Sequence, residues 1–287
     1  MKLKQVSLFF LFISIIFSTY ITAGGYEEYI LGKEKRGSSS ARVYSEEEMR
    51  DMQLKKNFFV LTAYDLGTMG LTGFDQEWTT WRTRVGLLQN GLQLPYLEVS
   101  RHSRNNLINY TYDIGGYFDL GSSYAHLEAG WGADSIYQYD FKILAEYTHP
   151  FIQYLFLKEK YKYLSINTGE DIHILSPGFI YYFDNHYLVG YVNILLSNLR
   201  ETSYTASLKL NFNIAPPLDF WIGTEMGQRL YDMTGAFDPL TQEGYVVFTG
   251  FRYRITNYVS FFMNLLYGYE EPDYHHKSCE FGVMVEF

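Results

Sequence analysis

The chain has 287 residues, of which 19% are aromatic and 19% are charged, and its formal net charge is −9. An acidic chain lacks the basic face that nucleic-acid binding requires, so we expect no nucleic-acid partner. The single cysteine, Cys279, excludes a framework of internal disulfides. The abundance of Tyr and Phe, with 28 and 22 copies, favours a β-rich protein, either soluble or embedded in a membrane.

Residues 1–23 are predicted to be a signal peptide. Lys2 and Lys4 make a basic start, an apolar run follows over about residues 6–17, and the small residue Ala23 stands near the end. The apolar run is too short for an ordinary membrane-spanning helix, so we predict cleavage, with an uncleaved anchor as the alternative.

Residues 24–56 combine Gly, Ser and charges of both signs. Such a composition buries too little apolar surface to fold, and it predicts a flexible periplasmic leader. Ser45 and Glu48 have the spacing of a capping box, so a short helix is expected over about residues 46–56.

From residue 57 onward, segments rich in Tyr, Phe, Val, Ile, Leu and Thr are separated by turn-forming residues. The pattern predicts an all-β domain over 57–287. We expect a single antiparallel up-and-down transmembrane β-barrel of about fourteen strands, with twelve as the alternative. The predicted strands are 57–66, 77–89, 93–103, 107–120, 122–133, 138–148, 151–166, 170–183, 186–197, 203–214, 217–228, 244–255, 258–269 and 277–287.

The connections between these strands alternate in length. Asn90-Gly91 is a strong hairpin signal, and His149-Pro150 is predicted to be an equally tight turn. Longer connections, such as 229–243, occupy most of the intervening places. Tight turns at one rim and longer loops at the other are typical of a barrel in the bacterial outer membrane.

Alternation within the predicted strands separates an apolar from a polar face. In 258–269, for example, Val259, Phe261 and Met263 share one parity. The strands run to about 10–14 residues, long enough to cross a bilayer at a tilt, whereas soluble strands are usually about 5–6 residues. A soluble β-sandwich or a lipocalin-like barrel is the alternative.

The segment 151–166 fits this alternation poorly because it contains Lys158, Glu159, Lys160 and Lys162. A Lys on the lipid face at the bilayer midplane costs about 2–4 kcal/mol. We therefore expect either a bulge that shifts the parity or a position at the rim. A second bulge is expected at Pro177, which cannot donate to a strand ladder.

The polar parity carries charges of both signs, which we expect to line the lumen. They predict either a lumen filled by ion pairs or a narrow polar conduit whose charges select solutes. The lumen-lining candidates are Arg82, Arg84, Glu98, Asp113, Glu128, Asp140, Lys142, Glu146, Lys209, Glu225, Arg252 and Arg254.

The sequence contains no Gly-rich phosphate loop, paired cysteines or nucleophile elbow, so we assign no cofactor, metal ligand or catalytic residue. Two alternatives stay open. His275 and His276 lie in an acidic loop that could hold a surface metal ion. Glu98, Ser100 and His102 lie on the polar parity of one strand, and His126 and Glu128 on that of another. They would suit a lipid-modifying enzyme if they meet in the fold.

Four segments, "AGWGADSIYQYDFKILAEYTH", "YKYLSIN", "DIHILSPGFIYYF" and "HYLVGYVNILLSNL", resemble the YaiO family of outer-membrane β-barrel proteins. The stretch "IYYFDNHYL" over 180–188 approximates a Tyr-rich turn of that family. The resemblance extends over roughly residues 57–287. It implies an outer-membrane barrel linked to surface polysaccharide assembly or export, and it transfers no catalytic residues.

The final stretch, "CEFGVMVEF", alternates in strand fashion and ends on Phe287. We expect Phe287 to serve as an assembly signal for the barrel-assembly machinery, which with outer-membrane lipid is a predicted partner. The predicted function is non-enzymatic support of transport or export of a saccharide-like solute. Alternatives are the lipid-modifying enzyme and a structural or adhesive barrel that binds a partner through its extracellular loops.

Overall fold

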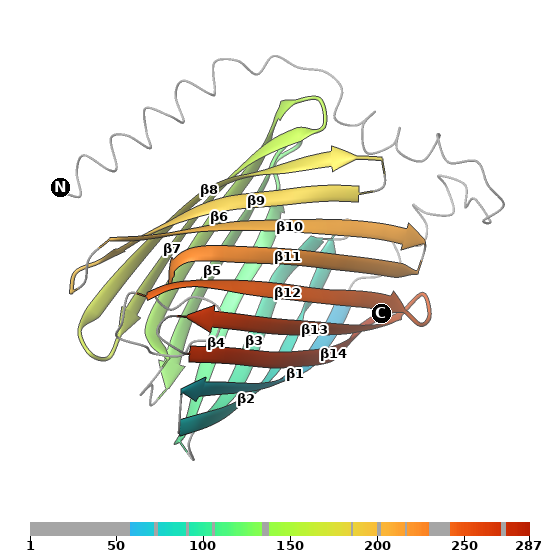
Figure 1. The fold of residues 1–287 in the computed structure, drawn as a ribbon. Coiled ribbons are helices and arrows are strands. Elements are labelled where there is room, and N and C mark those ends of the chain that lie inside the picture. Colours follow the sequence, from blue (N-terminus) through green and yellow to red (C-terminus); the bar gives the residue numbers. More distant parts are fainter. Residues whose placement is uncertain are drawn as a thin grey trace. The chain divides into compact units, whose positions relative to one another are not determined.

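The computed structural model describes residues 58–71, 74–89, 92–104, 107–133, 138–184, 186–199, 202–215, 217–229, 242–270 and 274–287. These residues form fourteen antiparallel strands that close into one barrel (Figure 1). Each strand pairs with its neighbours in sequence, and β1 pairs with β14. The predicted all-β, up-and-down barrel of about fourteen strands is confirmed, and the twelve-strand alternative is wrong.

The strand bounds agree closely with the alternation of the sequence. The main differences are that β1 extends about five residues further than predicted, that β6 continues past its predicted end and that β7 begins about four residues later than predicted. The strands are β1 (Phe58–Leu71), β2 (Phe74–Gln89), β3 (Leu92–Arg104), β4 (Leu107–Asp119), β5 (Tyr124–Ala133), β6 (Tyr139–Ile152), β7 (Leu155–Ile166), β8 (Glu170–Phe183), β9 (His186–Ser197), β10 (Ser203–Ala215), β11 (Leu218–Arg229), β12 (Gln242–Arg254), β13 (Val259–Glu270) and β14 (Tyr274–Glu286).

The barrel closes between its first and last strands. Their ladder runs without a register shift from Phe59 opposite Glu286 to Gly70 opposite His275. Beyond the ladder, the Phe287 amide donates a hydrogen bond to the Phe58 carbonyl at 2.8 Å. Closure leaves no free sheet edge, so every strand is hydrogen-bonded to a neighbouring strand on both sides.

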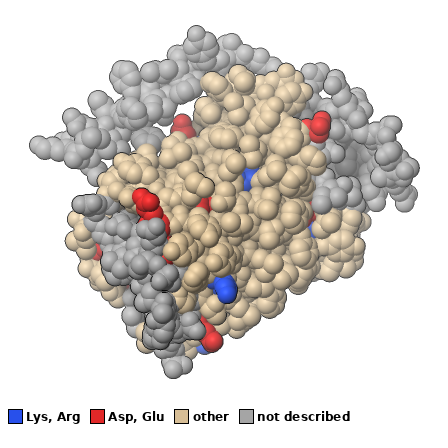
Figure 2. Space-filling view, viewed as in Figure 1, with Lys and Arg blue, Asp and Glu red and all other residues tan. Residues whose placement is uncertain are grey.

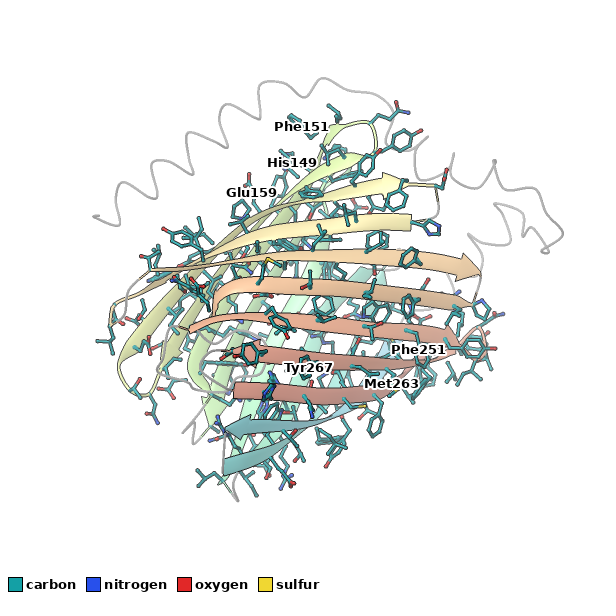
Figure 3. All side chains as sticks on the ribbon, in the orientation of Figure 1. His149, Phe151, Glu159, Phe251, Met263 and Tyr267 are labelled. Atoms are coloured by element: carbon teal, nitrogen blue, oxygen red, sulfur yellow. The ribbon has the colours of Figure 1, made fainter. Side chains whose placement is uncertain are left out.

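The outer surface of the barrel is apolar. Figure 2 shows few charged side chains on the visible face, and Figure 3 places Phe251, Met263 and Tyr267 on β12 and β13. A continuous apolar exterior of this size is unstable in water and suits a lipid environment. Large exposed apolar residues around the outer surface of the barrel include Trp81, Leu97, Ile114, Leu127, Trp131, Leu208, Ile222, Val247 and Leu265.

Two features predicted for β6–β8, a tight turn at His149-Pro150 and a bulge at Pro177, are absent from the structure. The tight turn lies at Gln153 and Tyr154, where Tyr154 has a φ of 70°, and not at His149-Pro150, which remain in β6. Pro177 causes no register shift against β7. In the ladder between β8 and β9, Ser176 and Pro177 have no partner, and the register is the same on either side of them. The absent amide donor of Pro177 is therefore tolerated without a bulge.

Several expectations fall on residues that the structure does not describe. The predicted signal peptide over 1–23, the leader over 24–56 with its short helix, and the Asn90-Gly91 turn lie outside the described residues. In the part of the chain that is described, no helix is long and apolar enough to cross a membrane.

Candidate functional site

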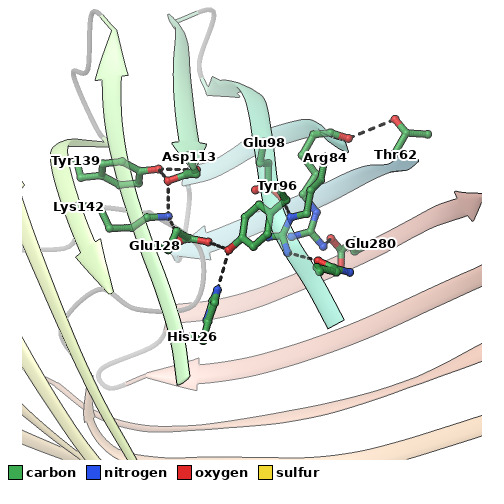
Figure 4. Close-up of polar contacts among 12 residues, drawn as sticks. Thr62, Arg84, Tyr96, Glu98, Asp113, His126, Glu128, Tyr139, Lys142 and Glu280 are labelled. Carbon is green, nitrogen blue, oxygen red and sulfur yellow. Dashed lines mark hydrogen bonds and ion pairs between the residues drawn. The ribbon is translucent and has the colours of Figure 1, made fainter. Parts of the chain in front are cut away.

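The interior of β3–β6 holds a connected set of polar side chains, which we call the lumen network: Tyr96, Asp113, Glu128, Tyr139 and Lys142 (Figure 4). Lys142 is its central cation, because its Nζ lies 2.6 Å from Asp113 Oδ1 and 2.7 Å from Glu128 Oε1. These three side chains are largely buried. Placing two carboxylates on one ammonium compensates the cost of removing the charges from water.

The contact between Lys142 and Asp113 is possible because the residue between them is a glycine. Asp113 is on β4 and Lys142 on β6, and Gly130 of β5 lies between them in the ladder. A Cβ built on Gly130 would lie 2.0 Å from Asp113 Oδ1. No other residue type could occupy this position while the ion pair keeps its place, since non-bonded carbon and oxygen atoms do not approach so closely.

Tyr96 also reaches its partner across a glycine of the intervening strand. Its hydroxyl donates to Glu128 on β5 by passing over Gly115 of β4, where a Cβ would lie 2.7 Å from the Tyr96 oxygen. The hydroxyl is also 2.8 Å from His126 Nε2. On the other side, the Arg84 guanidinium stacks 4.1 Å from the centre of the Tyr96 ring, a cation–π contact.

Tyr139 enters the network because of a bulge. The register against β7 shifts between Tyr139 and Phe141, which turns Tyr139 from the apolar parity to the lumen. Its hydroxyl donates to Asp113 at 2.8 and 3.0 Å to the two carboxylate oxygens. Asp140, a predicted lumen-lining residue, is exposed at the start of β6 and is not among the network residues.

A second chain of polar contacts crosses the barrel seam. Trp221 Nε1 donates to Asn264 Oδ1 at 3.1 Å, passing over Gly250 of β12. Asn264 Nδ2 donates to Glu280 of β14 at 2.6 Å, and Glu280 forms an ion pair with Arg82 of β2. The lumen contacts therefore continue from β11 through β14 to β2.

The charged segment of β7 follows the barrel alternation after all. Lys158, Lys160 and Lys162 share the lumen parity, because Lys158 Nζ lies 2.7 Å from Glu146 Oε1 on the lumen face of β6. Glu159 has the opposite parity. Neither a parity-shifting bulge in β7 nor a position at the rim is needed, since the lysines face inward and avoid lipid.

The predicted lumen residues fall into separate groups. Arg84 and Glu98 pair at 2.8 Å beside the lumen network, and the exposed Arg252 pairs with the half-buried Asp219 near the end of β12. Lys209 and Glu225 lie apart from the lumen network, on β10 and β11. Tyr96, Tyr139 and Trp221 were not among the sequence candidates. Tyr96 and Trp221 could have been found from the glycines beside them on the lumen face of the next strand, Gly115 and Gly250, which leave room for a long side chain.

The residues considered for lipid chemistry do not assemble into a triad. The two ring nitrogens of His102 lie 3.1 Å from the hydroxyls of Thr80 and Thr111, and Ser100 is not its partner. Glu98 is bound to Arg84, and His126 and Glu128 both contact the Tyr96 hydroxyl. Among the described residues, no three His, Cys, Asp or Glu side chains are grouped to hold a metal ion.

Comparisons with known proteins support the architecture. No protein-family model matches the chain, and no curated protein matches it. It is similar to the CymD monoaromatic hydrocarbon channel, with 9% identity and a TM-score of 0.55 over 92% of this chain and 93% of that chain. It is also similar to a bacterial polysaccharide outer membrane secretin, with 11% identity and a TM-score of 0.56 over 81% of this chain and 99% of that chain. At these identities the similarity shows the barrel fold alone.

Proposed function

We propose that the chain is a YaiO-family barrel of the bacterial outer membrane that conducts, or supports the export of, a polar saccharide-like solute. Its placement in lipid is favoured by the apolar exterior and by the closed ladder, which leaves no strand edge unpaired in a bilayer. Lipid of the outer membrane and the barrel-assembly machinery would then be its partners.

One observation carries the transport proposal: much of the barrel interior is lined by charged and aromatic side chains. A buried apolar cluster lines the interior only locally, on β7–β9, with Leu164, Ile166, Ile172, Ile174 and Leu195. The lumen network combines Tyr96 and Tyr139 with Asp113, Glu128 and Lys142. A sugar presents both hydroxyl groups and weakly polar C–H faces, which such a surface can bind through hydrogen bonds and aromatic contact.

The experiment is conductance of the purified full chain in planar bilayers, together with uptake of maltotriose into proteoliposomes. We expect discrete conductance steps and maltotriose entry above that of protein-free liposomes. Folding is verified in the same preparation by the heat-dependent shift of the barrel on gels. A folded barrel that passes neither ions nor maltotriose would refute the transport proposal.

A further inference from the structure

The lumen is electrically uneven around its circumference. On the β2–β6 side, carboxylates and cations are interleaved and joined, as in the lumen network. On the β7–β10 side, Glu170 is the acidic side chain among the described lumen positions, and its Oε1 accepts a hydrogen bond from Ser197. We call the lysines of this side the basic wall: Lys158, Lys160, Lys162 and Lys209.

Two members of the basic wall lack a carboxylate partner among the described residues. Glu146 stands opposite Lys160 in the β6–β7 ladder, yet its carboxylate is bound to Lys158. Lys209 has an aromatic neighbour instead, with its Nζ 4.8 Å from the centre of the Trp221 ring. An uncompensated ammonium in a confined lumen attracts anions more strongly than it would on an open surface.

Aromatic rings stand beside two members of the basic wall, Lys158 and Lys209. The Tyr191 ring of β9 lies 5.6 Å from Lys158 Nζ. It reaches across β8 because Gly178 leaves room: a Cβ there would lie 2.5 Å from Tyr191 Cδ1. Tyr191 is opposite Ser207, the neighbour of Lys209 on the lumen face of β10. Rings from β9 and β11 therefore stand beside Lys158 and Lys209 of the basic wall. Lys162 is opposite the buried Ile174 of β8, and Glu225 of β11 is opposite Ser207.

The combination of cations and aromatic rings favours some polar solutes over others. A neutral sugar accepts hydrogen bonds from the unpaired ammonium groups but gains no charge pairing, and a small inorganic anion gains nothing from the aromatic faces. A sugar that carries a carboxylate uses both, because its charge pairs with Lys while its C–H face packs on Tyr or Trp. We propose that the basic wall binds acidic saccharides, so that the cargo is a polyanionic, uronate-type polysaccharide. This inference rests on the proposed function and names its substrate class.

The experiment measures binding of trigalacturonate to the full chain in detergent micelles by isothermal titration calorimetry, with maltotriose and acetate as matched probes. We expect trigalacturonate to bind at least about tenfold more tightly than either probe, since only it presents both chemical features. Its affinity should fall as salt rises from 0.05 to 0.5 M, because screening weakens the Lys–carboxylate attraction.

A matched pair of variants tests the residues. Lys160→Gln should weaken trigalacturonate binding by about threefold to tenfold, the range of one partly solvated ion pair. Lys277→Gln removes the same charge from an exposed position on the exterior parity of β14, so binding should be unchanged. Equal effects of the two variants, or equal affinities for trigalacturonate and maltotriose, would overturn the proposal.

Conductance separates this inference from the proposed function. A barrel that conducts ions and passes maltotriose, but does not prefer trigalacturonate, leaves the transport proposal standing and removes the acidic substrate class. A folded barrel that neither conducts nor passes sugar removes both, because an acidic cargo requires a conduit. In a conducting barrel, trigalacturonate should reduce the current through the parent and Lys277→Gln proteins more than through Lys160→Gln.

Discussion

Gly130→Ala should destabilise the barrel far more than an alanine normally does in a strand. The new Cβ would stand 2.0 Å from Asp113 Oδ1, so the carboxylate must leave Lys142 and Tyr139. Breaking a buried ion pair costs about 3–5 kcal/mol. Since Lys142 keeps Glu128 as a partner, we expect a loss of about 2–3 kcal/mol in the free energy of unfolding.

Gly116→Ala is the matched control. A Cβ at Gly116 of β4 would meet Leu94 Cδ1 at 2.7 Å, the end of a flexible apolar side chain that can rotate away. Its cost should stay below about 1 kcal/mol. The assay is unfolding of the refolded barrel by guanidinium in detergent, followed by the fluorescence of its 4 tryptophans.

A double-mutant cycle supplies the refuting result. In a Lys142→Met background the ion pair is already gone, so Gly130→Ala should cost less than it does in the parent protein. Additive free energies for Gly130→Ala and Lys142→Met would show that the glycine does not act through the pair. The same conclusion would follow if Gly130→Ala and Gly116→Ala cost equal amounts.

Two further changes test other parts of the barrel. Tyr96→Phe removes the hydroxyl shared by Glu128 and His126, and should lower the free energy of unfolding by about 1–2 kcal/mol; no loss would contradict a role for these hydrogen bonds. Deleting Phe287 should lower the amount of barrel in the outer membrane of cells more than it lowers the stability of the refolded protein. Its side chain is exposed and its ring lies 6.1 Å from that of Phe58, so little packing is lost. Normal membrane levels of the truncated protein would contradict an assembly role.

Much of the barrel could be predicted because strand geometry is local. A two-residue period and turn-forming residues at regular intervals mark strands regardless of what they pair with. That is why β8 and β9 begin and end where the alternation predicts. The exceptions have non-local causes. Tyr139 faces the lumen because of a bulge against β7, and the continuation of β6 past Pro150 depends on its pairing with that same strand.

The sequence by itself determined the class of fold, the strand number and the inward or outward parity of most side chains, since these follow from the alternation of neighbouring residues. Only the tertiary structure decided which lumen residues meet. Register and stagger place Gly115 between Tyr96 and Glu128, and Gly130 between Asp113 and Lys142. Two side chains can touch across an intervening strand only where that strand has no side chain between them. The contact therefore depends on residues from three strands.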